Sequence, residues 1–268
     1  MDNLVDAFTD IVKNNTVADI IKIHSKNKQD IREIVLNFVN IQSVRTILDL
    51  GCGTGFFTKA LHGRIQSNAH LTGIDYCNNN ENPFLKNCRE TGFEGDFFNS
   101  YLPDLNPIVN KKFDLILCSY ALYFFPELIP QISRMLNLDG LFIAITHAKQ
   151  HLNELILLVK KILKENSNVM KQDLPYEKLL NNFSDKNAYQ LLSPWFKKIE
   201  VLDYKNSLIF DKKDFSDFIK YFRHKSPFFI QNNKDLHDEV INCLKKEMKT
   251  MKSFETNKDD VIFICSKK

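Results

Sequence analysis

The stretch ILDLGCGTGFFTKAL, residues 47–61, joins a strand-like apolar run to a glycine-rich turn. Gly51, Gly53 and Gly55 fall within five positions, directly after the apolar run ends. Glycine permits positive φ angles and lets the backbone approach a ligand closely. A helix that follows such a turn would present unpaired N–H groups to the same ligand. The stretch therefore predicts a strand, a ligand-binding turn and a helix over residues 55–65.

Strand-like and helix-like segments alternate from Thr46 to His147. This alternation predicts a parallel sheet that is covered by helices on both faces. The predicted strands are 46–50, 70–76, 93–98, 113–120 and 141–147. The predicted helices after the first one are 82–92, which ends at Gly92, and 126–140, which ends near Gly140.

The flanks of this region have a different texture. Before Thr46, apolar residues recur at helical spacing and predict two or three amphipathic helices, one of which starts at Asp30. After His147 most segments are helical, and strand-like stretches return at 197–210 and 259–268. All eight glycines lie between Gly51 and Gly140, so tight turns are concentrated in the middle of the chain.

Composition sets broad limits on the class of protein. The 268 residues are 44% hydrophobic and 26% charged, with a net charge of +3. This charge is too small to favour nucleic acid or an acidic membrane. The six cysteines form no CxxC pair and no metal-finger spacing, which predicts reduced cysteines, no metal site and a cytoplasmic location. The early acidic residues of MDNLVDAFTDIVKNN predict no secretory signal, and the sequence shows no apolar run of the ~20 residues that a membrane helix needs.

Acidic residues accompany three successive predicted strands. Asp49 precedes the glycine turn, Asp75 ends the second strand, and Asp96 is expected at the end of the third. Parallel strands present their carboxyl ends at one edge, so these acids should share a rim. There Asp75 can accept from ribose hydroxyls and Asp96 from an exocyclic amine. The alternative is structural, because aspartate also caps helices and occupies loops.

The motif DLGCGTG, the strand-end Asp75, the pair Gly95-Asp96 and the segment FDLILCSYALYFF resemble the class I S-adenosylmethionine-dependent methyltransferases. Residue 56 is Phe, so the dinucleotide pattern GxGxxG is absent. The resemblance implies a Rossmann-like, seven-stranded, mostly parallel sheet with helices on both faces and an antiparallel hairpin at one edge. It implies S-adenosyl-L-methionine as the cofactor, bound by Asp49, Gly51, Cys52, Gly53, Gly55, Asp75, Tyr76, Asp96, Phe97 and Cys118.

The methyl acceptor is expected at the ends of the fourth and fifth strands. His147 and Tyr123 are the candidate catalytic residues, and His147 could take a proton from the acceptor. The candidate substrate-binding residues are Ser119, Tyr120, Tyr123 and His151. The alternatives are a strand-end His147 without a role, His151 on a helix surface and Tyr123 in simple packing. SYALYF replaces the (N/D)PP(Y/F) signature of amino-group DNA and protein methyltransferases, as in many small-molecule enzymes.

A helical cap is expected around the methyltransferase domain. Residues 1–45 and two insertions, at about 150–195 and 211–255, would form it, and residues 46–268 would form the domain. Aromatic residues of the second insertion, Phe218 and Phe222, are candidate substrate contacts. At helical spacing, aromatic residues are more often core, and that alternative stays open.

The sequence predicts a cytoplasmic methyltransferase that acts on an O or N atom of a small molecule, as a monomer or homodimer. The stretch THAKQHLNEL is similar to a segment of ribosomal-RNA guanine methyltransferases. Those enzymes carry an N-terminal four-cysteine zinc module, whereas no cysteine precedes Cys52 here, which argues against a nucleic-acid partner. The other alternative is a non-catalytic, cofactor-binding partner subunit.

Overall fold

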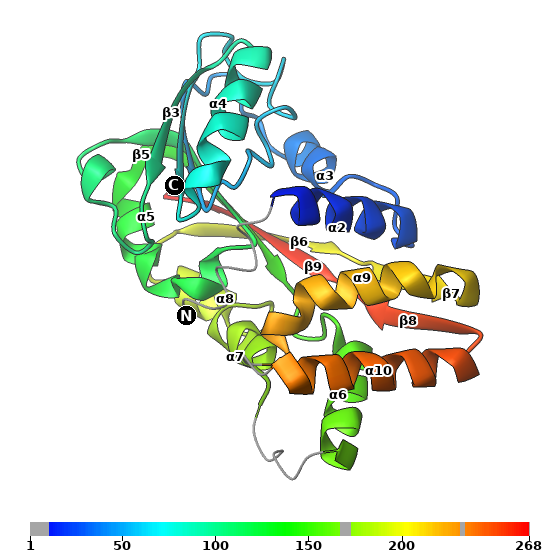
Figure 1. The fold of residues 1–268 in the computed structure, drawn as a ribbon. Helices are drawn as coiled ribbons and strands as arrows, with labels where there is room; N and C mark the ends of the chain where they lie inside the picture. Colours follow the sequence, from blue (N-terminus) through cyan, green and yellow to red (C-terminus); the bar gives the residue numbers. More distant parts are fainter. Residues whose placement is uncertain (1–10, 167–172, 231–233, 268) are drawn as a thin grey trace. The chain divides into compact units, whose positions relative to one another are not determined.

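The computed structural model describes residues 11–166, 173–230 and 234–267, and it divides into two compact units. The sheet unit comprises residues 29–147, 182–204 and 260–268. The helical unit takes in residues up to 28 together with 148–181 and 205–259. Figure 1 shows the fold, with labels on helices and strands from both units. Each unit is a compact body assembled from segments far apart in the sequence.

The sheet unit contains a seven-stranded sheet of order β3-β2-β1-β4-β5-β9-β6. Its first five strands in chain order pair in parallel, and β9 is antiparallel to both β5 and β6. In Figure 1 the red β9 lies between β5 and the yellow β6. The expected sheet with its antiparallel edge is confirmed. The strands are β1 (Thr46–Leu50), β2 (His70–Asp75), β3 (Glu94–Asn99), β4 (Phe113–Ser119), β5 (Leu136–His147), β6 (Lys198–Tyr204) and β9 (Asp260–Ser266).

Helices cover the sheet because side chains alternate between its two faces. Ile143 and Ile145 of β5 belong to the core that includes α3 and α4. Phe142, one residue before Ile143 and therefore on the opposite face, stacks on Phe196 with ring centroids 5.6 Å apart. Asp30 caps α3 as predicted, since its carboxylate accepts from the Arg32 amide. The helices of the unit are α3 (Ile31–Phe38), η2 (Asn78–Asn80), α4 (Glu81–Glu90), η3 (Asn106–Ile108), η4 (Leu122–Phe124), η5 (Pro126–Leu128), α5 (Ile129–Met135) and α8 (Ala188–Leu192).

The helical unit has its own aromatic core. Phe218 of α9 packs edge to face on Phe210 and Phe254, at centroid distances of 5.4 and 5.1 Å. Those two partners belong to β7 and β8, which form a separate antiparallel pair. No helix among the described residues is long and apolar enough to span a membrane. The elements of the unit are α2 (Ile11–His24), α6 (Asn153–Asn166), α7 (Pro175–Asn182), β7 (Ser207–Asp211), η6 (Lys212–Asp214), α9 (Phe215–Lys225), η7 (Ser226–Phe228), α10 (Lys234–Thr250) and β8 (Ser253–Asn257).

The predicted helix over residues 55–65 is wrong. The structure has a series of turns there, in which Thr58 bonds back to Gly55 and Leu61 bonds back to Phe57. These bonds mix three- and four-residue spacings, whereas a regular helix needs the four-residue spacing throughout. The carbonyl of Phe56 accepts instead from the Arg32 side chain, at 2.9 Å. The glycine turn therefore does not lead into a regular helix with aligned N–H groups.

The predicted helix over residues 126–140 is too long. It ends at Met135, and β5 begins at Leu136. Gly140 lies inside β5, near an irregular register between Phe113 and Leu115. A Cβ on Gly140 would come within 2.9 Å of the Asp114 carbonyl oxygen. This glycine therefore permits a close approach of two strands and does not end a helix.

Candidate functional site

The site expected at the carboxyl ends of the strands is defined by the strand order. From β1 the chain proceeds to β2 and β3 on one side, then crosses to β4 and β5 on the other. In open parallel sheets, ligands bind beyond the carboxyl ends of the strands at such a switch point. The glycine loop, residues 51–55, leaves β1 at this point.

The glycine loop adopts backbone angles that favour glycine. The φ angles of Gly51, Gly53 and Gly55 are +67°, +52° and +90°. A Cβ on Gly51 would lie 2.7 Å from the Cβ of Ala121. At Gly53, by contrast, an added Cβ would meet no described atom within 4 Å. Gly51 thus fits closely against the segment after β4, and Gly53 borders open space.

Asp75 points at the glycine loop. Its Oδ2 accepts from the Gly53 amide at 2.7 Å, and its Oδ1 accepts from the Cys77 amide at 2.8 Å and from Asn80 Nδ2 at 3.1 Å. A carboxylate offers about four acceptor positions, so these three bonds leave it with capacity for a ligand hydroxyl. The strand-end acid and the loop are therefore joined in one place, as the sequence predicts.

Asp49 is a buried acid close to Asp75. It is 4% exposed, and burial, together with the Asp75 carboxylate, raises its pKa to about 7. Loss of hydration disfavours the charged form of a carboxyl group, and a second negative charge adds to the effect. A ligand cation beside Asp49 would act in the opposite direction and favour the ionised form.

Asp49 should make the ligand-free protein less stable as the pH rises towards 8. The unfolded carboxyl has a pKa of about 3.9, and the folded one has a pKa of about 7. The folded state therefore holds the proton more tightly, and this stability is lost as the pH rises through 7. We expect the melting temperature of Asp49→Asn to rise relative to that of the wild type as the pH increases from 5 to 8. Calorimetry measures this difference. A difference that is constant with pH would contradict this prediction.

The structure places Asp96 differently from the prediction. β3 does not end at Asp96 but continues to Asn99, which pairs in register with Asp75. The Asp96 carboxylate lies 2.9 Å from Nε2 of His70, at the amino end of β2. Asn99 holds the expected rim position and donates to the carbonyls of Asp75 and Tyr76. The short strand-like run FEGDFF did not reveal where the strand would end.

The other predicted cofactor residues divide between rim and core. Tyr76 is 44% exposed, and its ring meets Tyr101 edge to face at 5.9 Å. Phe97 packs near Phe84 of α4, with centroids 6.0 Å apart. Cys52 and Cys118 are buried, and burial raises the pKa of both thiols. Among these residues, Tyr76 offers the largest exposed surface to a ligand.

Ser119 and Tyr120 lie at the carboxyl end of β4. The Ser119 hydroxyl oxygen is buried without a hydrogen-bond partner among the described residues. Such orphaned polar atoms are rare in folded proteins, and a ligand would account for this one. Tyr120 has a φ of +56°, which is uncommon outside glycine, and its ring meets the Phe56 ring edge to face, with centroids 6.1 Å apart. Uncommon backbone angles of this kind cluster at functional sites.

His147 is held in a network that sequence reasoning missed. Its Nδ1 lies 2.7 Å from Oδ1 of Asp260, and the Tyr120 hydroxyl donates to Oδ2 of Asp260 at 2.9 Å. His147 is 7% exposed and Asp260 is 3% exposed. Tyr123 stacks on the His147 ring at 5.8 Å and 21°. The structure therefore brings Tyr120, Tyr123 and His147 together around one buried carboxylate.

Three predicted substrate contacts belong to the helical unit. His151 is buried, and its Nδ1 is hydrogen-bonded to the Tyr176 hydroxyl. Phe218 and Phe222 are fully buried, and Phe222 packs on Phe229 at 5.9 Å. This geometry favours the packing alternative for both phenylalanines. The predicted contact of these three residues with an acceptor stays a prediction.

A seven-stranded sheet whose last strand is inserted antiparallel, with a glycine loop after β1 and an acid after β2, defines the class I methyltransferase fold. A profile described as a methyltransferase domain matches residues 41–195, more than half of the chain. The chain therefore belongs to this family of methyltransferase domains. No curated protein shows significant similarity to the sequence.

Solved structures share the fold at low sequence identity. The YcgJ protein of Bacillus subtilis is 15% identical with a TM-score of 0.55, and the alignment covers 88% of this chain and 98% of that one. The BH2331 protein of Bacillus halodurans is 10% identical with a TM-score of 0.56 and the same coverage. The plantazolicin methyltransferase BamL, solved with a triazolic desmethyl analogue and S-adenosylhomocysteine, is 17% identical with a TM-score of 0.50, covering 100% and 96%.

Proposed function

We propose that this protein binds S-adenosyl-L-methionine and transfers its methyl group to an O or N atom of a small-molecule acceptor. The observation that carries the proposal is the hydrogen bond between the Asp75 carboxylate and the Gly53 amide. It places the only strand-end acid of β2 against the glycine loop of a methyltransferase domain. The positive φ angles of the loop and the orphaned Ser119 hydroxyl fit a ligand at the same edge of the sheet.

Each residue of the edge has a part in this proposal. Asp75 accepts a hydrogen bond from a ribose hydroxyl, and Tyr76 lies beside the adenine. Asp49 and the glycine loop hold the methionine part, whose ammonium group offsets the cost of ionising a buried carboxyl. Asn99 takes the rim position that was expected for Asp96. The cofactor supplies a methyl group that is already activated by its positive sulfur.

The chain's own contribution to the reaction is positioning and proton transfer. Holding the acceptor in line with the methyl group accounts for much of the rate enhancement in such displacements. His147 takes a proton from the acceptor at its second ring nitrogen, while its Nδ1–H donates to Asp260. This arrangement suits an acceptor that must lose a proton, such as a hydroxyl group.

Calorimetry with S-adenosylmethionine and S-adenosylhomocysteine tests the proposal directly. We expect both compounds to bind with one site per chain and NAD to show no binding. Binding of NAD with neither of the methyl-donor compounds would overturn the methyltransferase function. A salt-sensitive association with structured RNA would instead favour the RNA-methylating alternative.

Asp260→Asn should reverse the tautomer of His147 without changing the size of the side chain. The carboxylate accepts from Nδ1–H, whereas the Asn amide can donate to Nδ1 and leave the proton on Nε2, where it blocks the base. Nitrogen NMR of protein labelled at histidine, at a pH where His147 is neutral, reports the protonated nitrogen. Tyr120→Phe is the matched control, because it removes the bond from the Tyr120 hydroxyl to Asp260 and should keep the wild-type tautomer. The same tautomer in all three proteins would contradict the proposed base.

The cellular setting is part of the proposal. All six cysteines are free, which supports a reducing compartment such as the cytoplasm. We propose that the protein is a monomer or homodimer. Light scattering of the purified chain measures the oligomeric state.

A further inference from the structure

The glycine loop is held by side chains from three different elements. Asp75, at the end of β2, accepts from the Gly53 amide at 2.7 Å. Asn87 of α4 donates through Nδ2 to the Thr54 carbonyl at 2.7 Å. Arg32 of α3 donates through Nη1 to the Phe56 carbonyl at 2.9 Å. The loop and its exit are therefore fixed at residues 53, 54 and 56.

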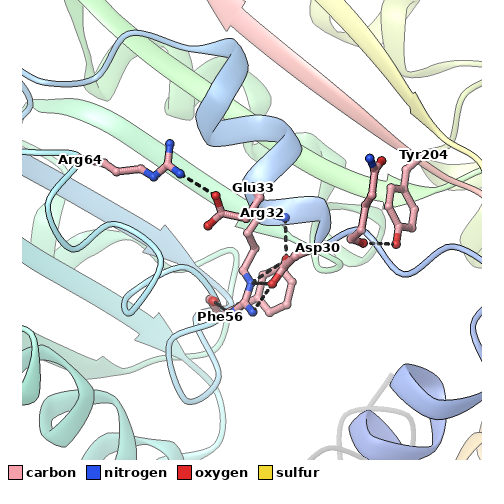
Figure 2. Close-up of polar contacts among 7 residues, drawn as sticks. Asp30, Arg32, Glu33, Phe56, Arg64 and Tyr204 are labelled. Atoms are coloured by element: carbon pink, nitrogen blue, oxygen red, sulfur yellow. Dashed lines mark hydrogen bonds and ion pairs between the residues drawn. The ribbon is translucent and has the colours of Figure 1, made fainter.

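The Arg32 contact is the most elaborate of the three. Figure 2 shows its guanidinium between the Asp30 carboxylate and Phe56, with Cζ 5.0 Å from the centroid of the Phe56 ring. Nε lies 3.0 Å from Oδ1 of Asp30, and Nη2 lies 2.5 Å from Oδ2. Asp30 raises the pKa of Arg32, so the guanidinium stays charged. One planar group thus meets a carboxylate, a carbonyl and an aromatic face.

The start of α3, which carries Arg32, is also held in place. Asp30 caps α3, and the Tyr204 hydroxyl donates to the Gln29 carbonyl at 2.7 Å, as Figure 2 shows. Tyr204 belongs to β6, inside the sheet unit. The start of α3 is therefore attached to the sheet, and Arg32 links that fixed point to the loop.

Because residues 55–65 form no regular helix, the contacts of Arg32 and Asn87 take over the ordering of the loop's carbonyl groups. In a loop that leads into a helix, successive intrahelical bonds fix the backbone carbonyls. Here the Thr54 and Phe56 carbonyls are fixed from outside, by Asn87 and Arg32. A loop that is already ordered loses less conformational entropy when it binds a ligand.

We propose that Arg32 and Asn87 are positioning residues that pre-order the glycine loop for the methyl donor. The inference rests on the proposed function, since it assigns the loop to S-adenosylmethionine. Neither residue needs to touch the ligand, because each acts through a backbone carbonyl of the loop segment. Loss of either contact lowers the population of the binding-competent loop and weakens the apparent affinity by the same factor.

Arg64→Met is the matched control for Arg32→Met. Figure 2 shows Arg64 bonded to Glu33, which lies on α3 as Arg32 does, with Nη2 2.6 Å from Oε2. Its Nη1 donates to Asn37 at 2.8 Å. Both variants thus remove an arginine–carboxylate pair from α3, but only Arg32→Met releases a carbonyl next to the glycine loop.

Calorimetry with S-adenosylhomocysteine as the probe compares the affinities of the positioning variants with that of the Arg64→Met control. We expect Arg32→Met to bind about tenfold more weakly than the wild type, Asn87→Ala about fivefold more weakly, and Arg64→Met within about twofold. Hydrogen exchange of amides 53–57, measured without ligand, should accelerate in Arg32→Met and Asn87→Ala and stay unchanged in Arg64→Met.

Wild-type affinity and unchanged exchange in Arg32→Met and Asn87→Ala would overturn the inference, as would equal weakening by Arg64→Met. Should the wild type itself fail to bind S-adenosylhomocysteine, the proposed function fails, and the exchange measurement still tests whether the contacts order the loop. Asn87→Ala lies on another helix, so it keeps the test valid if Arg32→Met does not fold.

Discussion

Asp75→Ala is expected to weaken the binding of S-adenosylhomocysteine by about 100-fold or more. A hydrogen bond to a charged group is worth about 1.5–3 kcal/mol, so losing the bond from one ribose hydroxyl would by itself weaken binding about 10- to 150-fold. The substitution also removes the acceptor of the Gly53 amide, which further loosens the loop. Calorimetry at a temperature well below the melting point measures the effect, and the melting temperature shows that the variant is folded.

Asp96→Ala is the matched control for Asp75→Ala. Asp96 lies on the neighbouring strand, but its carboxylate pairs with His70 and lies 4.0 Å from Lys111, not against the loop. We expect its affinity for S-adenosylhomocysteine to stay within about twofold of the wild type, since exposed ion pairs contribute little. If Asp96→Ala weakened binding as much as Asp75→Ala, the assignment of the ribose to Asp75 would be wrong.

Gly51→Ala should destabilise the sheet unit strongly, by about 3 kcal/mol or more. The positive φ costs an L-residue about 1–2 kcal/mol, and the new Cβ would lie 2.7 Å from the Cβ of Ala121. That neighbour is attached directly to the backbone, so it cannot rotate away, and overpacking of this kind adds about 1–3 kcal/mol. Denaturant unfolding of the wild type and the variant measures the difference.

Two further variants isolate the steric part of this prediction. Gly53 also has a positive φ, but an added Cβ meets no described atom within 4 Å, so Gly53→Ala should cost only about 1–2 kcal/mol. Ala121→Gly removes the atom that the Gly51→Ala methyl group would strike. The double variant Gly51→Ala/Ala121→Gly should therefore recover part of the stability lost in Gly51→Ala. Equal costs at both glycines, with no recovery, would exclude the proposed clash.

The sheet and the glycine loop could be predicted from the sequence because their signals are local. The apolar runs of β1 and β4, bounded by glycine or polar residues, identify buried strands without knowledge of their partners. Three glycines after β1 indicate a turn with positive φ, and the structure has it. Asp75 can be predicted in the same way, because it ends a strand-like segment.

The sequence-based predictions are wrong where a distant contact replaces a local one. The pattern after Gly55 is helical, but Arg32 from α3 takes the Phe56 carbonyl. Gly140 resembles a helix end, but it serves the close approach of Asp114 from the neighbouring strand. Asp260 could not be paired with His147 from the sequence, because their contact depends on the register of β9 against β5.

The order of the strands also governs when the sheet can form during protein synthesis. β5 and β6 pair with β9, the last strand of the sheet in chain order, and not with each other. A growing chain therefore exposes unpaired edges of both strands until residues 260–266 have left the ribosome. Unpaired strand edges are prone to association with other chains, so a nascent chain stalled before this segment should depend on chaperones.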